Sequence, residues 1–393
     1  MRYRTDKSGA QLSQLGYGCM RFTTKGGSID YEKAEHEILL AIERGVNYFD
    51  TAYIYSGSEE CLGRVLAENG CRDRVNIATK LPQYIMRSRR QIDKTFREEL
   101  RRLRTDHIDY SLMHMFTDYS EWENLERLGI EDWIAAQKQA GTIRNIGFSY
   151  HGNTEIFLRI LNAYDWDFCQ IQYNYLDEES QAGRRGLEAA AEKGVPVMIM
   201  EPLRGGKLVN LPEKARDALR DSGWQGSAAE LGLRWLWDQP GVTVVLSGMN
   251  SAEMVEENSR IADEAAVGAF TDEDRVRVET VKAIIRERQK VGCTGCRYCM
   301  PCPQGVDIPA TFHYYNLMYF EKKTPVRYEY ARNVGMRSEA GFATKCDGCG
   351  KCERHCPQHI EIREMLRQAD RDLRPLPFRA GIAVMRGVLG RNG

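Results

Sequence analysis

The sequence predicts a (β/α)8 barrel followed by a smaller, mainly helical domain. Between residues 15 and 263, short β-branched runs alternate with longer helical patterns, which is typical of βαβ units on a parallel sheet. The pattern contains eight such units, and a closed barrel of eight units usually takes about 250 residues. No Gly-x-Gly-x-x-Gly turn follows the first strand, which further weakens the alternative of a doubly wound open sheet.

Eight strands are expected in the first part of the chain. The segments between them, such as residues 90–104 and 131–141, place apolar residues three and four positions apart, as helices packing on a sheet must. The expected strands are LGYGCM from residue 15, YFDTA from 48, VNIATKL from 75, IDYSLMH from 108, IRNIGFS from 143, FCQIQYN from 168, PVMIMEP from 196 and VTVVLSG from 242.

The pattern changes at Thr271, where a second part of the chain begins. Thr271 and Asp274 form a capping signal, and one charged helix is expected from there toward Cys293. Beyond it, residues 308–323 and 360–373 are helical in pattern, and so small a core must depend on whatever the cysteines bind. We therefore divide the chain into a barrel (1–270), a connector helix (271–291), a cysteine-rich domain (292–375) and a C-terminal tail (376–393).

The overall composition limits the classes of partner. A formal net charge of -1 gives no electrostatic reason to expect nucleic acid, so small molecules or proteins are the expected partners. The amino terminus lacks the apolar run of a secretion signal, and no segment is apolar enough for a transmembrane span, so we expect a cytoplasmic protein. Residues 378–393 could lie on a membrane surface, but docking onto the body of the protein is favoured.

Cysteine usage divides the chain in two. Twelve cysteines in a reducing compartment argue against disulfides, and eight of them lie within residues 293–356. The other four stand in apolar or mixed surroundings and are expected to be small buried side chains: Cys19, Cys61, Cys71 and Cys169.

The second cysteine motif has the spacing of bacterial two-cluster ferredoxins, in which the fourth cysteine ligates the other cluster. Structural zinc sites prefer separated Cys-x-x-Cys pairs, whereas three cysteines at three-residue intervals can surround three irons of one cubane. Iron–sulfur ligation is therefore favoured over zinc. The motif consists of Cys346, Cys349, Cys352 and Cys356, followed by Pro357.

The first cysteine motif is one residue shorter before its last cysteine, and it also ends in proline. With the fourth ligands exchanged, two [4Fe-4S] clusters are expected in a ferredoxin-like domain. Cys293, Cys296 and Cys299 with Cys356 would hold one cluster, and Cys346, Cys349 and Cys352 with Cys302 would hold the other.

Ionisable residues stand at the carboxyl ends of three successive expected strands. Asp50 follows the second strand, Lys80 the third and His114 the fourth, and Tyr55 lies in the loop after Asp50. Each alone could be a cap, a packing residue or a satisfied polar group. Together they lie at the face where barrel enzymes place their chemistry.

The sequence resembles the aldo-keto reductases over about residues 1–263. The resemblance rests on FDTAYIYSGSEECLGRVL (49–66), IATKL (77–81), DYSLMH (109–114), IGFS (146–149) and EEN (256–258). The C-terminal extension, with CTGCRYCMPCPQGVDIP and CPQHIEIREML, looks like the iron–sulfur branch of that family. The resemblance implies an NAD(P)H-linked oxidoreductase that acts on a carbonyl or related small substrate.

The resemblance implies a catalytic tetrad of Asp50, Tyr55, Lys80 and His114. A free phenol with a pKa of about 10 is a poor proton donor at neutral pH, so Lys80 would stabilise the phenolate of Tyr55. Asp50 would keep the lysine charged and oriented. His114 would hold the carbonyl oxygen while a nicotinamide hydride attacks the carbon.

The resemblance also implies nucleotide contacts. Ser149 and Gln170 would hold the carboxamide, and Asn258 would lie near the adenine; Met200, Leu203 and Gly248 match further cofactor-binding positions. Tyr150 replaces the asparagine that often follows the serine. Met254 stands where NADPH-preferring members carry an arginine, so both NADP(H) and NAD(H) remain candidates.

Three functions are compatible with the two parts of the chain. In the first, the barrel reduces its substrate and the clusters connect it to a one-electron redox protein; a flavin could stand between, although no flavin motif is present. In the second, the same chemistry is kept and the clusters are structural or oxygen-sensing. In the third, the chain is a non-enzymatic, cofactor-sensing regulatory subunit.

Overall fold

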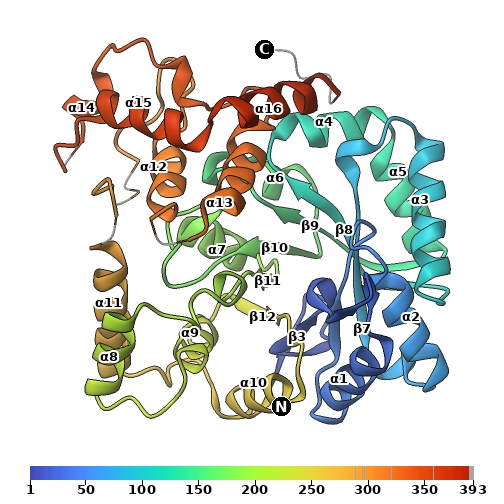
Figure 1. The fold of residues 1–393 in the computed structure, drawn as a ribbon. Coiled ribbons are helices and arrows are strands. Elements are labelled where there is room, and N and C mark those ends of the chain that lie inside the picture. Colours follow the sequence, from blue (N-terminus) through green and yellow to red (C-terminus); the bar gives the residue numbers. More distant parts are fainter. Residues whose placement is uncertain (288, 294, 296, 320, 357, 389–393) are drawn as a thin grey trace.

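Eight parallel strands close into a barrel, in the order β10-β11-β12-β3-β6-β7-β8-β9 around its circumference (Figure 1). The computed structural model describes residues 1–287, 289–293, 295, 297–319, 321–356 and 358–388. All eight expected strands are confirmed, each within a few residues of its expected limits. They are β3 (Leu15–Gly18), β6 (Tyr48–Asp50), β7 (Asn76–Leu81), β8 (Ile108–Phe116), β9 (Ile143–Tyr150), β10 (Phe168–Gln172), β11 (Val197–Met200) and β12 (Val242–Ser247).

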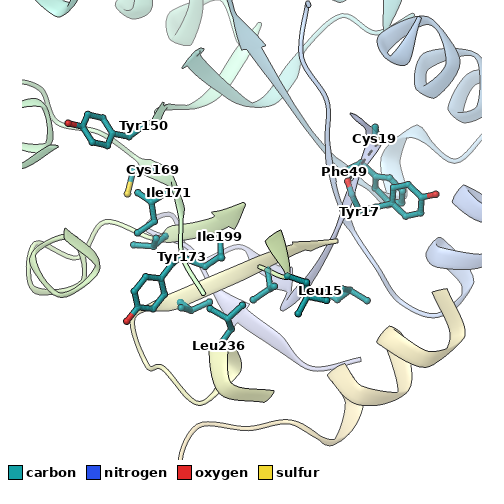
Figure 2. Close-up of a cluster of buried hydrophobic side chains, with 14 of the residues drawn as sticks. Leu15, Tyr17, Cys19, Phe49, Tyr150, Cys169, Ile171, Tyr173, Ile199 and Leu236 are labelled. Carbon is teal, nitrogen blue, oxygen red and sulfur yellow. Dashed lines mark hydrogen bonds between the residues drawn. The ribbon is translucent and has the colours of Figure 1, made fainter. Parts of the chain in front are cut away.

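Alternation along each strand sorts the side chains into two cores. Tyr48, Ala78 and Tyr110 belong to a cluster inside the barrel. Their sequence neighbours Phe49 and Ile77 belong to the larger cluster between the strands and the surrounding helices. Figure 2 shows part of that larger cluster, which draws side chains from strands far apart in the sequence.

An N-terminal hairpin that the sequence patterns did not predict leads into the barrel. Strands β1 (Tyr3–Thr5) and β2 (Gln11–Ser13) pair antiparallel immediately before β3. Leu12 is fully buried in the cluster inside the barrel, and the Tyr110 hydroxyl donates to the Asp6 carboxylate at 2.5 Å. The hairpin therefore covers the amino end of the barrel and leaves the carboxyl end for the site. A second hairpin joins β4 (Thr24–Lys25) and β5 (Ser28–Ile29).

Helices cover the outside of the barrel. Those in the first 264 residues are α1 (Tyr31–Glu43), α2 (Ser58–Glu68), α3 (Arg89–Arg102), α4 (Tyr119–Arg127), α5 (Ile130–Gln139), α6 (Thr154–Ala163), α7 (Gly183–Glu192), α8 (Glu213–Asp221), α9 (Ala228–Trp237) and α10 (Ala252–Glu264). The four cysteines outside the motifs are buried, as expected.

The expected connector helix is real but shorter, and it is part of the barrel's outer layer. The capping box of Thr271 and Asp274 begins α11 (Asp272–Arg286) as predicted. The helix ends five residues before the expected limit, and it packs against α8 because its apolar face is buried through Val278 and Val281.

The second domain has a hydrophobic core of its own, and no strand occurs among its described residues. Its tail docks back as expected, because Ile382 is buried in that core and the Arg386 guanidinium donates to the carbonyl oxygen of Arg337 at 2.8 Å. No helix in the described part of the chain combines the length and apolarity needed to cross a membrane. The domain contains α12 (Ile308–Leu317), α13 (Lys323–Tyr330), the π-helical turn η5 (Ala331–Gly335), α14 (Lys351–Arg354), α15 (Ile362–Leu373) and α16 (Leu376–Val388).

A buried arginine joins the two domains. Arg204, in the loop after β11, pairs with Asp177 of the loop after β10 and with Glu321 of the second domain. Its Nε lies 2.9 Å from the Glu321 carboxylate, and Glu329 lies 3.7 Å from a terminal nitrogen. Burial by itself disfavours the charged guanidinium, but Asp177 and Glu329 more than compensate and raise its pKa. The second domain is therefore held over the carboxyl ends of β10 and β11.

Substitution Arg204→Ala should destabilise the protein by about 3–5 kcal/mol, because it leaves the carboxylate of Asp177 buried without its cation. Denaturant unfolding followed by circular dichroism measures the change. The matched control is Arg220→Ala on α8, whose guanidinium pairs only with exposed carboxylates and should leave the unfolding midpoint unchanged. An Arg204→Ala midpoint equal to that of the wild type would contradict this account of the interface.

Candidate active site

The structure brings the four expected catalytic side chains together at the carboxyl rim of three adjacent strands. Asp50 is the last residue of β6, Lys80 lies one residue before the end of β7, and His114 lies two residues before the end of β8. Tyr55 follows β6 in a turn, where its own backbone amide donates to the carbonyl oxygen of Ala52 at 2.9 Å. Because the strands are neighbours in the closed barrel, residues 64 positions apart reach one point.

Lys80 is held by two short contacts in the interior. Its Nζ lies 2.6 Å from Oδ1 of Asp50 and donates to the carbonyl oxygen of Thr51 at 2.6 Å. Burial alone would lower the pKa of the ammonium, but the negative charge of Asp50 and the phenol of Tyr55 outweigh it, so the pKa is raised. Lys80 is therefore a fixed positive charge beneath Tyr55.

Tyr55 lies between the lysine and the histidine. The Lys80 Nζ is 5.1 Å from the centroid of its ring, and the His114 ring meets it edge to face at 6.0 Å between centroids. Burial raises the pKa of Tyr55, with Lys80 opposing the rise. The phenol is consequently protonated at neutral pH and could donate that proton to a ligand.

His114 is neutral. Burial and the positive charges of Lys80 and Arg332 lower its pKa well below the usual 6.5. The Nδ1 atom is buried without a hydrogen-bond partner among the described residues. Tyr84, in the loop after β7, lies 6.5 Å from the histidine ring and was missed by the sequence reasoning because no strand-end pattern marks it.

Two of the expected carboxamide contacts lie side by side. Ser149 on β9 and Gln170 on β10 are partners in the strand register, and both are almost fully buried. The Ser149 hydroxyl accepts the backbone N–H of Met115 at 2.7 Å, and Oε1 of Gln170 has no partner among the described residues. An unpaired amide oxygen at this rim fits the amide N–H of a nicotinamide.

The other expected nucleotide contacts follow β11 and β12. Met200 ends β11 and Leu203 lies in the loop beyond it, whereas Gly248 is exposed directly after β12. Asn258 on α10 is buried, and its amide donates to the Ser247 hydroxyl at 3.1 Å. β11 and β12 are neighbours in the barrel, and Asn258 reaches the end of β12 through Ser247.

Tyr150 and Met254 depart from the family pattern in different ways. Tyr150 does not replace the missing asparagine at the site, because its ring packs against that of Phe157, with 5.2 Å between centroids, in the cluster between strands and helices. Met254 is 46% exposed in the first turn of α10. The single basic residue of that helix, Arg260, is engaged by Glu230 at 2.8 Å.

Arg21 is a further cation that the sequence reasoning missed. It ends the short turn after β3, and a Cβ on Gly205 would lie 2.7 Å from its Nη2. A Cβ on Gly248 would touch the stem of the same side chain at 3.4 Å. The exposed guanidinium thus lies between the loops after β11 and β12, and only its position in the fold reveals this.

The described motif cysteines border two small hollows in the second domain. One is lined by Cys302, Cys346, Cys349 and Cys352, the other by Cys293 and Cys356, and Cys299 lines both. Cys296 and Pro357 lie outside the described residues. Within the described ranges, no three potential ligands converge tightly enough for one metal ion, whereas a cubane needs a wider cage.

Comparisons with known proteins agree with the two-part architecture. Residues 14–279 match the family model described as the aldo/keto reductase family, and residues 292–361 match a 4Fe-4S dicluster domain. A holo-form aldo-keto reductase structure from Bacillus halodurans aligns with a TM-score of 0.59 at 27% identity, covering 72% of this chain and 96% of that one.

Two curated relatives are similar over most of their own length. The aldo-keto reductase YhdN of Bacillus subtilis is 24% identical, covering 70% of this chain and 91% of that protein. A probable voltage-gated potassium channel subunit beta of rice, Oryza sativa subsp. japonica, is 25% identical, covering 74% of this chain and 98% of that protein. The chain belongs to the aldo/keto reductase family and is an aldo-keto-reductase-like oxidoreductase with a C-terminal 4Fe-4S dicluster domain.

Proposed function

We propose that the protein reduces a carbonyl group of a small substrate with NAD(P)H in the barrel, and that two [4Fe-4S] clusters exchange single electrons with a partner protein. The observation that carries the first part is the convergence of the tetrad. Lys80 lies 2.6 Å from Asp50 and faces the ring of Tyr55, which in turn meets His114. That arrangement suits transfer of one proton to a developing alkoxide.

Each side chain of the tetrad has a separate role in the proposed reduction. NAD(P)H, when bound, would supply the hydride that reduces the carbonyl carbon. His114, being neutral, donates a hydrogen bond to the carbonyl oxygen and polarises it. Tyr55 gives its phenolic proton to that oxygen as the carbon is reduced, which completes the alcohol. Lys80 stabilises the phenolate left behind, and Asp50 keeps the lysine in place.

Support for nucleotide binding comes from the unpaired Gln170 oxygen and from Arg21. Gln170 and Ser149 would hold the carboxamide, and Arg21 is placed to meet the nucleotide phosphates. Met254 offers no charge to a 2′-phosphate, so NADH is accepted as well as NADPH in this proposal.

The proposed ligands of the clusters are the cysteines that border the two hollows, with Cys296 added to the set of Cys293, Cys299 and Cys356. Six of them pack against the core of the second domain, which also favours a second candidate role, in which the clusters stabilise that domain. Addition of NADPH or NADH to anaerobic protein distinguishes the roles. Bleaching of the visible absorbance supports electron exchange, and unchanged absorbance supports a structural role.

Substitution Tyr55→Phe should reduce carbonyl turnover by about 10²- to 10⁴-fold, because the general acid is lost. Nucleotide binding, measured by quenching of protein fluorescence, should be unchanged. The matched control is Tyr53→Phe, two residues earlier, whose ring lies beneath Arg102 rather than at the tetrad. Wild-type turnover in Tyr55→Phe would contradict the assignment of the acid.

The pH profile of kcat/KM for reduction should be flat from about pH 6.5 to 9. The raised pKa of Tyr55 keeps the phenol protonated until the pH exceeds its usual value of 10, and the lowered pKa of His114 keeps the imidazole neutral above 6.5. Activity should therefore fall only on the alkaline side. Initial rates in a constant-ionic-strength buffer test this, and an acid limb near pH 6.5 would show that a charged His114 forms.

Iron analysis of anaerobically purified protein should give about eight irons per chain, and Cys302→Ala should lose about half of them. The remaining iron should stay with the set that contains Cys293 and Cys356. Cys71→Ala, at a buried cysteine in the barrel, is the control and should keep all of the iron. Zinc in place of iron, or full iron in Cys302→Ala, would contradict the ligand assignment.

A further inference from the structure

The second domain contributes a cation to the mouth of the barrel. The π-helical turn η5 follows α13 directly, and α13 lies beside the barrel rim in Figure 1. Ser338, just beyond η5, donates its hydroxyl to Asp118 at 2.8 Å, in the loop that follows β8. Asn333 and Val334 of η5 line a cavity of about 270 Å³ together with His151, which follows β9. The segment that carries Arg332 therefore lies over the ends of β8 and β9.

The segment that carries Arg332 is fixed in place. Arg337 pairs with the buried Asp307 at 2.7 Å, and the amide of Gly341 donates to the carbonyl oxygen of Val334 at 3.0 Å. Arg386 of the C-terminal helix holds the other side through the carbonyl oxygens of Arg337 and Ser338. A segment tied at this many points presents its side chains in one arrangement.

In the described part of the chain, the two terminal nitrogens of the Arg332 guanidinium are free to bind a ligand. Its Nε donates to the side-chain oxygen of Asn333 at 2.9 Å, and Asn333 is fixed in turn by the Tyr314 hydroxyl at 2.6 Å. Within the described ranges no carboxylate lies within 4.0 Å of Arg332: Glu329 on the preceding helix is engaged by Arg204. The contact through Nε orients the two terminal nitrogens, which is the geometry for bidentate binding of an anion.

The positive charge of Arg332 reaches the catalytic groups. It lowers the pKa of His114, after burial and Lys80, and it contributes to the lowered pKa of His151. It also opposes, more weakly, the rise in the pKa of Tyr55 and of Tyr84. These four residues belong to the loops and ends of four successive strands, so the charge acts on the centre of the rim. Glu201 acts on Tyr55 with the opposite sign.

We propose that Arg332 binds an anionic group of the substrate, so that the substrate class is a carbonyl compound that also carries a carboxylate or a phosphate. The inference rests on the proposed carbonyl reduction. Tyr55 and His114 bind the reacting carbonyl oxygen, and Arg332 binds the anion at the other end of a small substrate. A barrel without the second domain would lack this group, so the domain completes the substrate site as well as binding iron.

Kinetics with paired probes test the proposal on the full-length protein with its clusters. The carboxylate pair is 4-carboxybenzaldehyde and its methyl ester, and the phosphate pair is glyceraldehyde 3-phosphate and glyceraldehyde. Arg332→Gln should reduce kcat/KM for the preferred anionic probe by about 10- to 100-fold. The kcat/KM for its neutral counterpart and the KM for the nucleotide should be unchanged. Arg332→Lys should restore part of the loss, because it keeps the charge but not the bidentate geometry.

The control is Arg371→Gln, an exposed arginine of α15, which should match the wild type with every probe. Equal losses for anionic and neutral probes, or a change only in the KM for the nucleotide, would overturn the assignment of Arg332 and leave carbonyl reduction intact. Retention of visible cluster absorbance in each variant shows that the second domain is folded.

Binding of benzoate to the nucleotide-loaded protein separates the two proposals, because calorimetry does not require turnover. Binding that weakens about tenfold or more in Arg332→Gln supports the anion site even if no aldehyde is reduced, in which case carbonyl reduction fails alone. Inorganic phosphate is titrated in the same way; equal affinities of wild type and variant for both anions, or no binding of either anion, overturn the anion site.

Discussion

The arrangement of the two domains depends on one buried cation. Arg204 cannot lose its proton, so its burial requires carboxylates close by. Asp177 supplies one from the barrel, and Glu321 and Glu329 supply two from the second domain. Glu321 also pairs with Lys207, so the two cations of the loop after β11 are matched by carboxylates from both domains. The interface is therefore set by charge compensation, and it fixes the second domain at the carboxyl ends of β10 and β11, on the same rim of the barrel as the tetrad.

The position of the second domain adds further side chains to the rim of the barrel. In the barrel itself, Lys80 forms a buried pair with Asp50, and the phenol above it remains protonated. The second domain adds the tied segment that carries Arg332, and it lines a cavity with His151. The tetrad thus lies at or next to the ends of barrel strands, whereas the segment above it belongs to the second domain, which has its own hydrophobic core. Such a division lets one catalytic apparatus acquire a new substrate class through the domain placed above it.

Much of the barrel and the rim positions of the tetrad could be predicted because their signals are local. Each strand has a short apolar run, and Asp50, Lys80 and His114 occur at strand ends, where a closed parallel barrel must bring them together. Thr271 marked the start of α11 through its cap. The end of that helix and its packing on α8 were not predictable, because both depend on a distant apolar surface. Tyr150 faces Phe157 because of strand register, which a motif comparison does not contain.

By itself, the sequence determined the alternation of strands and helices, the rim positions of the tetrad and the spacing of the cysteines, because each follows from residues close together along the chain. Only the tertiary structure decided the contacts made across long separations. Arg204 meets Glu321 across 117 positions, and Ser338 meets Asp118 across 220. No local periodicity encodes such pairs, since they form only when two separately built cores pack together. The placement of Arg332 over the rim is a consequence of that packing.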